Sequence, residues 1–174
     1  MDNETLKTMI YYDGIVKGYD ALYYDEQKKK IESIKDIFPN FGIMLDLGSG
    51  TGIINKYVHD KKNLIVIATD LSFKMLKQNK TFFKIQADAL SIPFKNKSFD
   101  FITSFSVIQD VLCIDTFLKN TWNILKDNGI FVLSFIKISS KRDNIEKLVE
   151  KKFIKIEYLE EEKDVILILK KIIR

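Results

Sequence analysis

The sequence has few of the residues that build disulfides, metal centres and flexible linkers. Its 174 residues include one cysteine, Cys113, and one histidine, His59. A single cysteine can form neither an intrachain disulfide nor a cysteine-based metal cluster, so we expect no metal site. The two prolines, Pro39 and Pro93, interrupt apolar patterns, and no linker of low complexity divides the chain. We therefore expect one domain over residues 1–174, since a domain usually takes roughly 100–200 residues.

Long apolar runs and a secretory leader are also missing. The apolar run Ile130–Leu133 is far shorter than the roughly 20 residues that span a bilayer. The opening segment Met1–Glu4 is polar and acidic, whereas a secretory signal begins with basic and then apolar residues. Apolar residues make up 46% of the chain and charged residues 30%, a balance that argues against intrinsic disorder. These features predict a cytoplasmic protein without a membrane segment.

Arginine is scarce as well. Arg142 and Arg174 are the only arginines among 28 basic residues, and the formal net charge is +4. Arginine supplies the planar fork that reads phosphates and base edges, so the composition argues against a sequence-reading nucleic-acid module. The many lysines fit a solvated surface, although they can also attract a phosphate backbone.

Apolar runs typical of strands alternate with helical segments along the chain. Strands are expected at Ile43–Leu47, Leu64–Ala68, Phe82–Gln86, Phe99–Phe105, Ile130–Ile136, Phe153–Leu159 and Val165–Ile172. Helices are expected at Asp20–Phe38, Ile53–His59, Ser72–Asn79, Asp115–Lys126, closed by Asp127–Gly129, and Ser140–Glu150. The alternation predicts an α/β fold of three layers, α/β/α, around a doubly wound and mostly parallel sheet, whose last two strands can form a hairpin. Ligands of such sheets bind at the carboxyl ends of the strands.

The strongest motif is the glycine-rich turn of residues 45–52, Leu-Asp-Leu-Gly-Ser-Gly-Thr-Gly. Glycines at alternate positions let the backbone approach a ligand closely. A dinucleotide fingerprint needs a glycine where this chain has Ile53, and a P-loop needs a Gly-Lys-Ser/Thr sequence that is absent. Asp46 would repel a pyrophosphate but suits a ligand with a positive group. The alternative is a turn with a structural role alone.

Two further acids follow the next two predicted strands. Asp70 stands 18 positions after Gly52, where a carboxylate can accept hydrogen bonds from both hydroxyls of a ribose. Asp88 follows the third strand, where it could accept from an exocyclic amine. Together with Asp46, these acids predict a site for an adenosine-bearing cation without phosphates.

Several segments together resemble the class I S-adenosylmethionine-dependent methyltransferases, in particular their short generic methyltransferase domain. They are the Asp-x-Gly-x-Gly-x-Gly turn, Asp70–Ser72 with Met75–Leu76, Ala87–Phe94, Ser98–Asp100 and Leu125–Gly129, and the resemblance covers roughly Tyr11–Ile138. It implies a seven-stranded sheet whose last strand is antiparallel and inserted beside the fifth. It also implies S-adenosylmethionine as cofactor and S-adenosylhomocysteine as product. Residues 1–39 would form helices that cover the cofactor, on a core of residues 40–174.

The resemblance assigns roles at this site. Asp46, Gly48 and Gly50 would line the methionine half of the cofactor, Asp70 would hold the ribose, and Asp88 would meet the adenine amine. Leu71 and Ala89 would flank the adenine, while Ser104 or Phe105 would present a backbone oxygen to the cofactor's amine. Tyr11 or Tyr19 could contact the cofactor's carboxylate or sulfonium, with helix packing as the alternative. The implied cofactor-binding set is Tyr11, Tyr19, Asp46, Gly48, Ser49, Gly50, Gly52, Asp70, Leu71, Asp88, Ala89, Ser104 and Phe105.

The methyl acceptor is less constrained by the sequence. The His pair that relatives often carry after the fourth strand is absent from Val107–Val111, and Ser104–Val107 replaces the Asn/Asp-Pro-Pro-Tyr/Phe signature of enzymes that methylate planar nitrogens. Gln109 and Asp110 are the candidates for orienting the acceptor or receiving its proton, with a helix cap as the alternative for Asp110. His59 is expected on the surface.

Three hypotheses for the acceptor follow from the lengths of the connections. Only residues 137–139 separate the fifth strand from the next helix, where small-molecule methyltransferases of the family commonly carry an insertion. An open pocket suits tRNA or another translation macromolecule, and residues 87–94 and 99–109 resemble tRNA wobble-uridine methyltransferases that use a small zinc-binding activator subunit. The alternatives are a small-molecule methyltransferase, with the helix before Pro39 as lid, and a cofactor-binding subunit that needs a partner.

Overall fold

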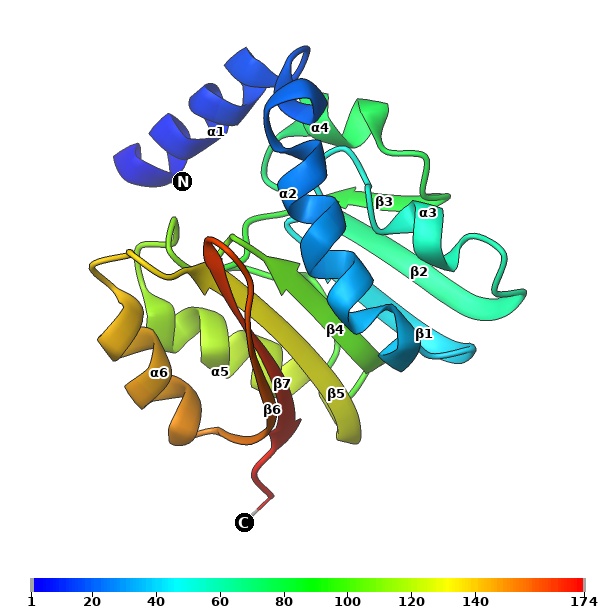
Figure 1. Ribbon diagram of the computed structural model, residues 1–174, viewed down its shortest axis with the longest axis vertical. Coiled ribbons are helices and arrows are strands. Elements are labelled where there is room, and N and C mark those ends of the chain that lie inside the picture. The colour runs from blue at the N-terminus through cyan, green and yellow to red at the C-terminus, as the bar shows by residue number, and fades with distance from the viewer. Residues whose placement is uncertain (1, 174) are drawn as a thin grey trace.

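The computed structural model describes residues 2–173, and a seven-stranded sheet forms its centre (Figure 1). The order of the strands is β3-β2-β1-β4-β5-β7-β6. Strands β1 to β5 pair in parallel, and β7 lies between β5 and β6, antiparallel to both. The strands are β1 Phe41–Leu47, β2 Asn63–Asp70, β3 Phe83–Gln86, β4 Phe99–Phe105, β5 Leu125–Ile136, β6 Phe153–Glu160 and β7 Asp164–Lys171. The predicted α/β fold and the inserted antiparallel strand are confirmed.

Helices pack on both faces of this sheet. The helices of the structure are α1 Asn3–Ile15, α2 Tyr19–Ile34 with the 3-10 turn η1 Lys35–Ile37, α3 Asn55–Val58, α4 Phe73–Gln78, α5 Ile114–Ile124 and α6 Arg142–Glu150. Apolar residues of α2 and α3 form one core cluster with β1, β4, β5 and β7, and those of α5 and α6 form the other. Figure 1 shows that α1 instead lies beyond the carboxyl ends of the strands.

Successive side chains of each strand point to opposite faces of the sheet, so the core is divided into two clusters. Met44 of β1 is buried in the cluster of α2 and α3, and its neighbour Leu45 is buried in the cluster of α5 and α6. On α5, Ile114, Phe117 and Leu118 recur at helical spacing and are buried against the sheet. Each such side chain contributes about 1.5–3 kcal/mol when it is removed from water. The buried layers hold the strand ends, and therefore the acids that follow them, in fixed positions.

The start of β5 differs from the prediction. We expected a helix to Lys126 that is closed by Asp127–Gly129, but α5 ends at Ile124 and β5 begins at Leu125. The register shifts along β5, so the residues between Leu125 and Ile130 form an irregular stretch of the strand. The ammonium of Lys171 donates to the carbonyl of Leu125 at 2.7 Å. This contact comes from the last strand and cannot be read from the local sequence.

No helix within residues 2–173 is both long and apolar enough to cross a membrane.

Candidate functional site

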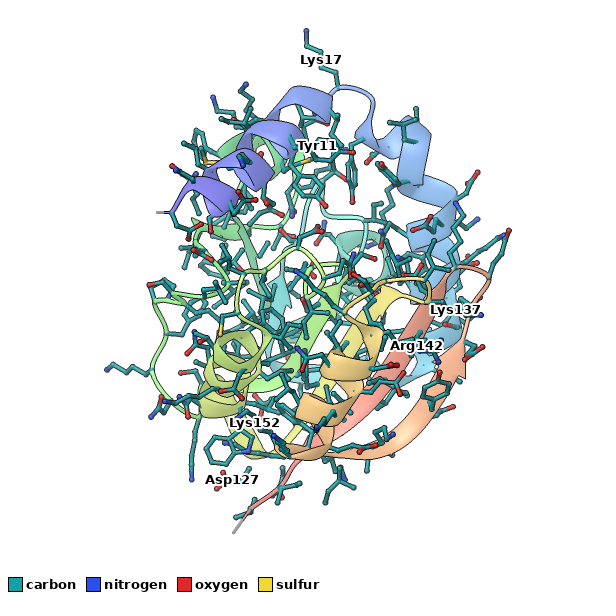
Figure 2. The ribbon with its side chains drawn as sticks, turned by 90° about the vertical axis from the view of Figure 1, so that its left-hand side faces the viewer. Tyr11, Lys17, Asp127, Lys137, Arg142 and Lys152 are labelled. Atoms are coloured by element: carbon teal, nitrogen blue, oxygen red, sulfur yellow. The ribbon has the colours of Figure 1, made fainter. Side chains whose placement is uncertain are left out.

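A cavity of about 590 Å³ lies at the carboxyl ends of β1, β2 and β4. Its walls are the glycine-rich turn, the segments after β2 and β3, the loop after β4, and residues of α1 and α2. This volume is within the range of pockets that bind small ligands, about 300–1,000 Å³. In Figure 2, Tyr11 lies on the side of α1 that faces the body of the protein. The N-terminal helices, rather than an insertion after β5, therefore supply this part of the cavity wall.

The glycine-rich turn is shaped by backbone angles that favour glycine. Gly48, Gly50 and Gly52 have φ values of +77°, +52° and +83°. The N–H groups of Gly48 and Ser49 both donate to the carbonyl of Thr69 at 2.8 Å, which ties the turn to the end of β2. Gly50 lies under the ring of Tyr19, which is 3.8 Å from the position that a Cβ would take. A side chain at Gly50 would project towards this ring and narrow the cavity.

Asp70 anchors the turn and faces the cavity. Its Oδ2 accepts the N–H of Gly50 and its Oδ1 accepts the N–H of Ser72, both at 2.8 Å. Burial raises the pKa of the Asp70 carboxyl, and the two N–H donors act in the opposite direction. An ionised carboxylate offers about four acceptor positions. About two of them remain for a ligand with a pair of hydroxyls.

Asp88 follows β3 and also lines the cavity, between Ala87 and Ala89. Its Oδ1 accepts the N–H of Leu90 at 2.8 Å, and its backbone oxygen accepts the N–H of Ser91 at 2.9 Å. These two bonds fix the carboxylate in a turn. Within residues 2–173, Oδ2 has no hydrogen-bond partner, so this oxygen can accept from a ligand.

Asp46 is the most deeply buried acid of the site, with 5% of its surface exposed. Burial raises the pKa of its carboxyl to about 7, the hydrogen bond from Thr103 Oγ1 lowers it, and the charge of Asp70 raises it. Near neutral pH the protein therefore carries a carboxyl that is close to half protonated. A positive group nearby would favour the ionised form.

The burial of Asp46 predicts a specific pH dependence of stability. The pKa is about 7 in the folded chain and 3.8 ordinarily, so the folded chain binds the additional proton between these values. The contribution of Asp46 to stability is thus lost as the pH rises from about 4 to about 7. Asp46→Asn, which keeps the acceptor for Thr103, should therefore gain stability relative to wild type over this window, on the order of 1 kcal/mol per pH unit. Urea unfolding at pH 5, 6, 7 and 8 measures this difference, and parallel curves for the two proteins would contradict it.

The loop after β4 forms the opposite wall. Ser106 has a left-handed φ of +56°, and its N–H donates to the carbonyl of Ser134 at 3.1 Å. Gln109 Nε2 donates to the carbonyl of Ser106 at 2.9 Å. The ammonium of Lys141 donates to the carbonyls of Gln109 and Val111 at 2.6 and 3.0 Å. These bonds close the loop into a defined shape.

Asp110 is held on this loop by a tyrosine of α1. The hydroxyl of Tyr12 donates to Asp110 Oδ2 at 2.8 Å. Burial raises the pKa of the Asp110 carboxyl, while the bond from Tyr12 and the charge of Lys141 lower it. Because α5 begins at Ile114, Asp110 does not cap that helix.

Most of the predicted site residues are brought together by the fold. The residues that line the large cavity are Tyr11, Tyr19, Gly48, Gly50, Asp70, Leu71, Asp88, Ala89, Phe105, Gln109 and Asp110. Asp46 and Ser49 line a small neighbouring cavity together with Gly48 and Gly50.

Two predicted residues line neither cavity. Gly52 packs against the side-chain amide of Asn79. Ser104 is fully buried, and its Oγ has no hydrogen-bond partner among the described residues. His59 is exposed at the end of α3, as expected.

Sequence reasoning missed several residues of the wall that α2 contributes. Tyr23 and Glu26 line the cavity beside Tyr19. Lys30 is fully buried one turn further, where it donates to Ser106 Oγ at 2.7 Å and pairs with Asp164 Oδ2 at 3.1 Å. Positions 19, 23, 26 and 30 lie on one face of a helix. Helical spacing from Tyr19 would therefore have identified these residues.

Comparison with known proteins adds to this geometry. A family described as "Methyltransferase domain" matches residues 45–133, about half of the chain. The chain is 31% identical over 151 residues to an uncharacterized protein of Methanocaldococcus jannaschii, covering 84% of this chain and 58% of that protein. It is 30% identical over 142 residues to the malonyl-[acyl-carrier protein] O-methyltransferase of Marinomonas sp., covering 74% of this chain and 51% of that protein. The chain thus spans about half the length of these curated relatives.

A solved structure has the same fold. It is a complex between the Haloferax volcanii Trm112 methyltransferase activator and a proposed methyltransferase, with a TM-score of 0.76 at 15% identity. The match covers 92% of this chain and 97% of that chain.

Proposed function

The chain belongs to the class I S-adenosylmethionine-dependent methyltransferases, and from this premise we propose that its cavity is the site where a methyl group is transferred to a small-molecule acceptor. The family uses S-adenosylmethionine, which supplies a methyl group activated by a sulfonium. The protein then has to bind and orient the acceptor and exclude water. Proximity and orientation of this kind can contribute roughly 7–11 kcal/mol without a dedicated base.

The chemistry of the cavity fits this cofactor. Asp70 would accept the two ribose hydroxyls at its remaining acceptor positions, and Asp88 Oδ2 would accept the adenine amine. Leu71 and Ala89, on the same wall, would flank the adenine. In this proposal residues 1–39 cover the cofactor and residues 40–174 form the core.

The glycine-rich turn would hold the methionine half. Gly48, Gly50 and the buried Asp46 offer close backbone approach and a carboxyl that a positive group would ionise. Tyr19 would lie over this half, while Ser49 and Gly52 keep the shape of the turn. The backbone oxygen of Ser104 or Phe105, at the end of β4, would accept from the cofactor's amine.

Gln109 and Asp110 would act on the acceptor. Both line the cavity on the loop after β4, and Tyr12 and Lys141 hold that loop in place. Burial raises the pKa of Asp110, which favours its taking a proton from an acceptor. Gln109 would orient the acceptor.

One observation carries the choice of a small-molecule acceptor, namely that α1 and α2 line the same cavity as the strand ends. Thr5, Thr8 and Tyr12 of α1 line this cavity together with Gln109 and Val111 of the core. A cavity of about 590 Å³, with walls from both the N-terminal helices and the strand ends, suits the cofactor and a small acceptor better than the surface of a folded RNA.

A macromolecular acceptor, such as tRNA, with a small activator subunit is the second candidate. Two observations favour it, the likeness of fold to the activator-bound structure and an exposed apolar edge at β3. Phe82 is 87% exposed and Phe83 is 48% exposed there. Exposed apolar patches of this kind often mark interfaces between proteins. A cofactor-binding subunit that transfers its methyl group only with a partner is a variant of this candidate.

Methyl-labelled cofactor distinguishes these proposals. The full chain is incubated with labelled S-adenosylmethionine and with either a metabolite extract, hypomethylated RNA or hypomethylated protein. We expect label in the small-molecule fraction, together with S-adenosylhomocysteine. Label in RNA or protein would support the second candidate. Tight binding of the cofactor with no label in any fraction would support the cofactor-binding subunit.

A further inference from the structure

Four tyrosines of the N-terminal helices form a cluster on the wall of the cavity. Tyr11 and Tyr12 come from α1, and Tyr19 and Tyr23 come from α2. Ring centroids are 5.2 Å apart for Tyr11–Tyr12, 6.4 Å for Tyr12–Tyr19 and 5.0 Å for Tyr19–Tyr23. The hydroxyls of Tyr23 and Tyr11 lie 3.5 Å apart and complete the circuit. All four residues line the cavity, so we name them the tyrosine box.

The tyrosine box lies between the two halves of the proposed site. Tyr19 lies over Gly50, on the half assigned to the cofactor. The hydroxyl of Tyr12 donates a hydrogen bond to Asp110, on the loop assigned to the acceptor. A hydrogen bond to a carboxylate makes the phenol ring richer in electrons, which strengthens its attraction to a cation. The space beside the box is therefore suited to positive charge.

The charged side chains around the box also favour a positively charged ligand. Glu26, Asp70, Asp88 and Asp110 line the cavity, and Lys7 is the only cation among the lining residues that the structure describes. The ammonium of Lys7 lies 2.6 Å from Glu4, and its side chain is 71% exposed.

Two further lysines, Lys30 and Lys163, contact Glu26 at the edge of this lining. Glu26 pairs with Lys30 and Lys163 at 3.3 Å each, so its charge is largely compensated. Lys30 also pairs with Asp164. Asp110 accepts a hydrogen bond from the neutral Tyr12, with the charge of Lys141 nearby, and is the acid that faces the box from the acceptor side.

From this arrangement we infer that the methyl acceptor is an amine, and that the tyrosine box binds its nitrogen as an organic cation. The inference rests on the proposed function and assigns its substrate class. Before the transfer, the bound ammonium gives one proton to Asp110 or to water, which frees the nitrogen lone pair. This lone pair forms the new N–C bond while the methyl–sulfur bond breaks and leaves its electron pair on sulfur. Positive charge thus moves from sulfur to nitrogen, and the product is a methylated ammonium.

An amine differs from other acceptors because its methylated product carries the positive charge. A hydroxyl or carboxylate acceptor gives a neutral product, so the box would face no positive charge after transfer. A methylated amine keeps the charge, and contact with aromatic faces is worth about 0.5–2 kcal/mol. The box and Asp110 also disfavour phosphate-bearing acceptors, because acids outnumber cations in the lining that the structure describes.

Binding of a model cation tests the inference without any measurement of activity. The full chain is saturated with S-adenosylhomocysteine and titrated by calorimetry with choline or with its neutral isostere, 3,3-dimethylbutan-1-ol. We expect choline to bind about tenfold more tightly than the isostere. Equal affinities, or no binding of choline to the loaded protein, would overturn the inference. A chain that fails to bind S-adenosylhomocysteine would overturn the proposed function itself.

Variants at Tyr23 distinguish the contribution of the aromatic ring to binding from an effect on folding. Tyr23→Leu should weaken choline binding about tenfold, whereas Tyr23→Phe should keep it because the aromatic face remains. Tyr24→Leu is the matched control, since Tyr24 packs in the other direction, under the ammonium of Lys56 and outside the cavity lining. Equal loss for Tyr23→Leu and Tyr24→Leu would contradict the inference. So would variants that change only the affinity for S-adenosylmethionine, because the box would then serve the cofactor's sulfonium.

Discussion

Replacing Asp70 with alanine should weaken the binding of S-adenosylhomocysteine by roughly 100-fold or more. Two hydrogen bonds from a ribose to an ionised carboxylate contribute about 1.5–3 kcal/mol each, and 1.4 kcal/mol is a factor of ten. The variant also removes the acceptor for the N–H groups of Gly50 and Ser72, so the turn loses its anchor to the end of β2. Calorimetry at pH 8 measures the effect with the carboxyl ionised, because burial raises the pKa of Asp70.

Two further variants show whether the loss is specific. Asp60→Ala removes an exposed carboxylate after α3 and should leave the affinity unchanged. Asp70→Asn keeps one oxygen acceptor and should give an intermediate loss. Thermal unfolding of Asp70→Ala without ligand separates a disordered turn from a lost contact. If Asp70→Ala binds within about threefold of wild type, the ribose does not lie at Asp70.

The central strands could be predicted because each is buried on both faces and therefore forms an almost continuous apolar run. The runs Ile43–Leu47 and Phe99–Phe105 lie within or coincide with β1 and β4. Asp70 and Asp88 could be placed for a related reason, since parallel strands bring their carboxyl ends to one edge of a sheet. The sequence therefore predicted the wall of the cavity that the sheet provides.

The other walls depend on contacts that are distant in sequence. Tyr12 reaches Asp110 from another helix, and the left-handed backbone of Ser106 has no signal in a serine. Lys30 is a clear case, because a lysine in an amphipathic helix is expected in solvent. It is buried because Asp164, one residue before the predicted strand Val165–Ile172, is buried beside it at the start of β7. Each buried charge is stabilised by the other, so neither burial can be predicted from one residue alone.

This pair should therefore be sensitive to the loss of one partner. Lys30 and Asp164 are each 1% exposed in their side chains, with 3.1 Å between Nζ and Oδ2. Lys30→Met leaves the carboxylate of Asp164 buried with only the Ser106 hydroxyl as donor, at 3.3 Å. Removing one member of a buried pair usually costs about 3–5 kcal/mol. Urea unfolding at neutral pH should show a loss of this size.

The double variant decides whether the pair itself stabilises the fold. Asp164→Leu alone should also destabilise, because it leaves the buried ammonium of Lys30 with Glu26 as its remaining ionic partner. Lys30→Met combined with Asp164→Leu removes both charges and fills the space with apolar atoms, so it should recover at least half of either single loss. Losses that simply add in the double variant would show that the two charges do not interact. Recovery would instead show that the desolvation of each charge is offset mainly by the other, and that this contact fixes α2, with Tyr23 and Glu26, against the sheet.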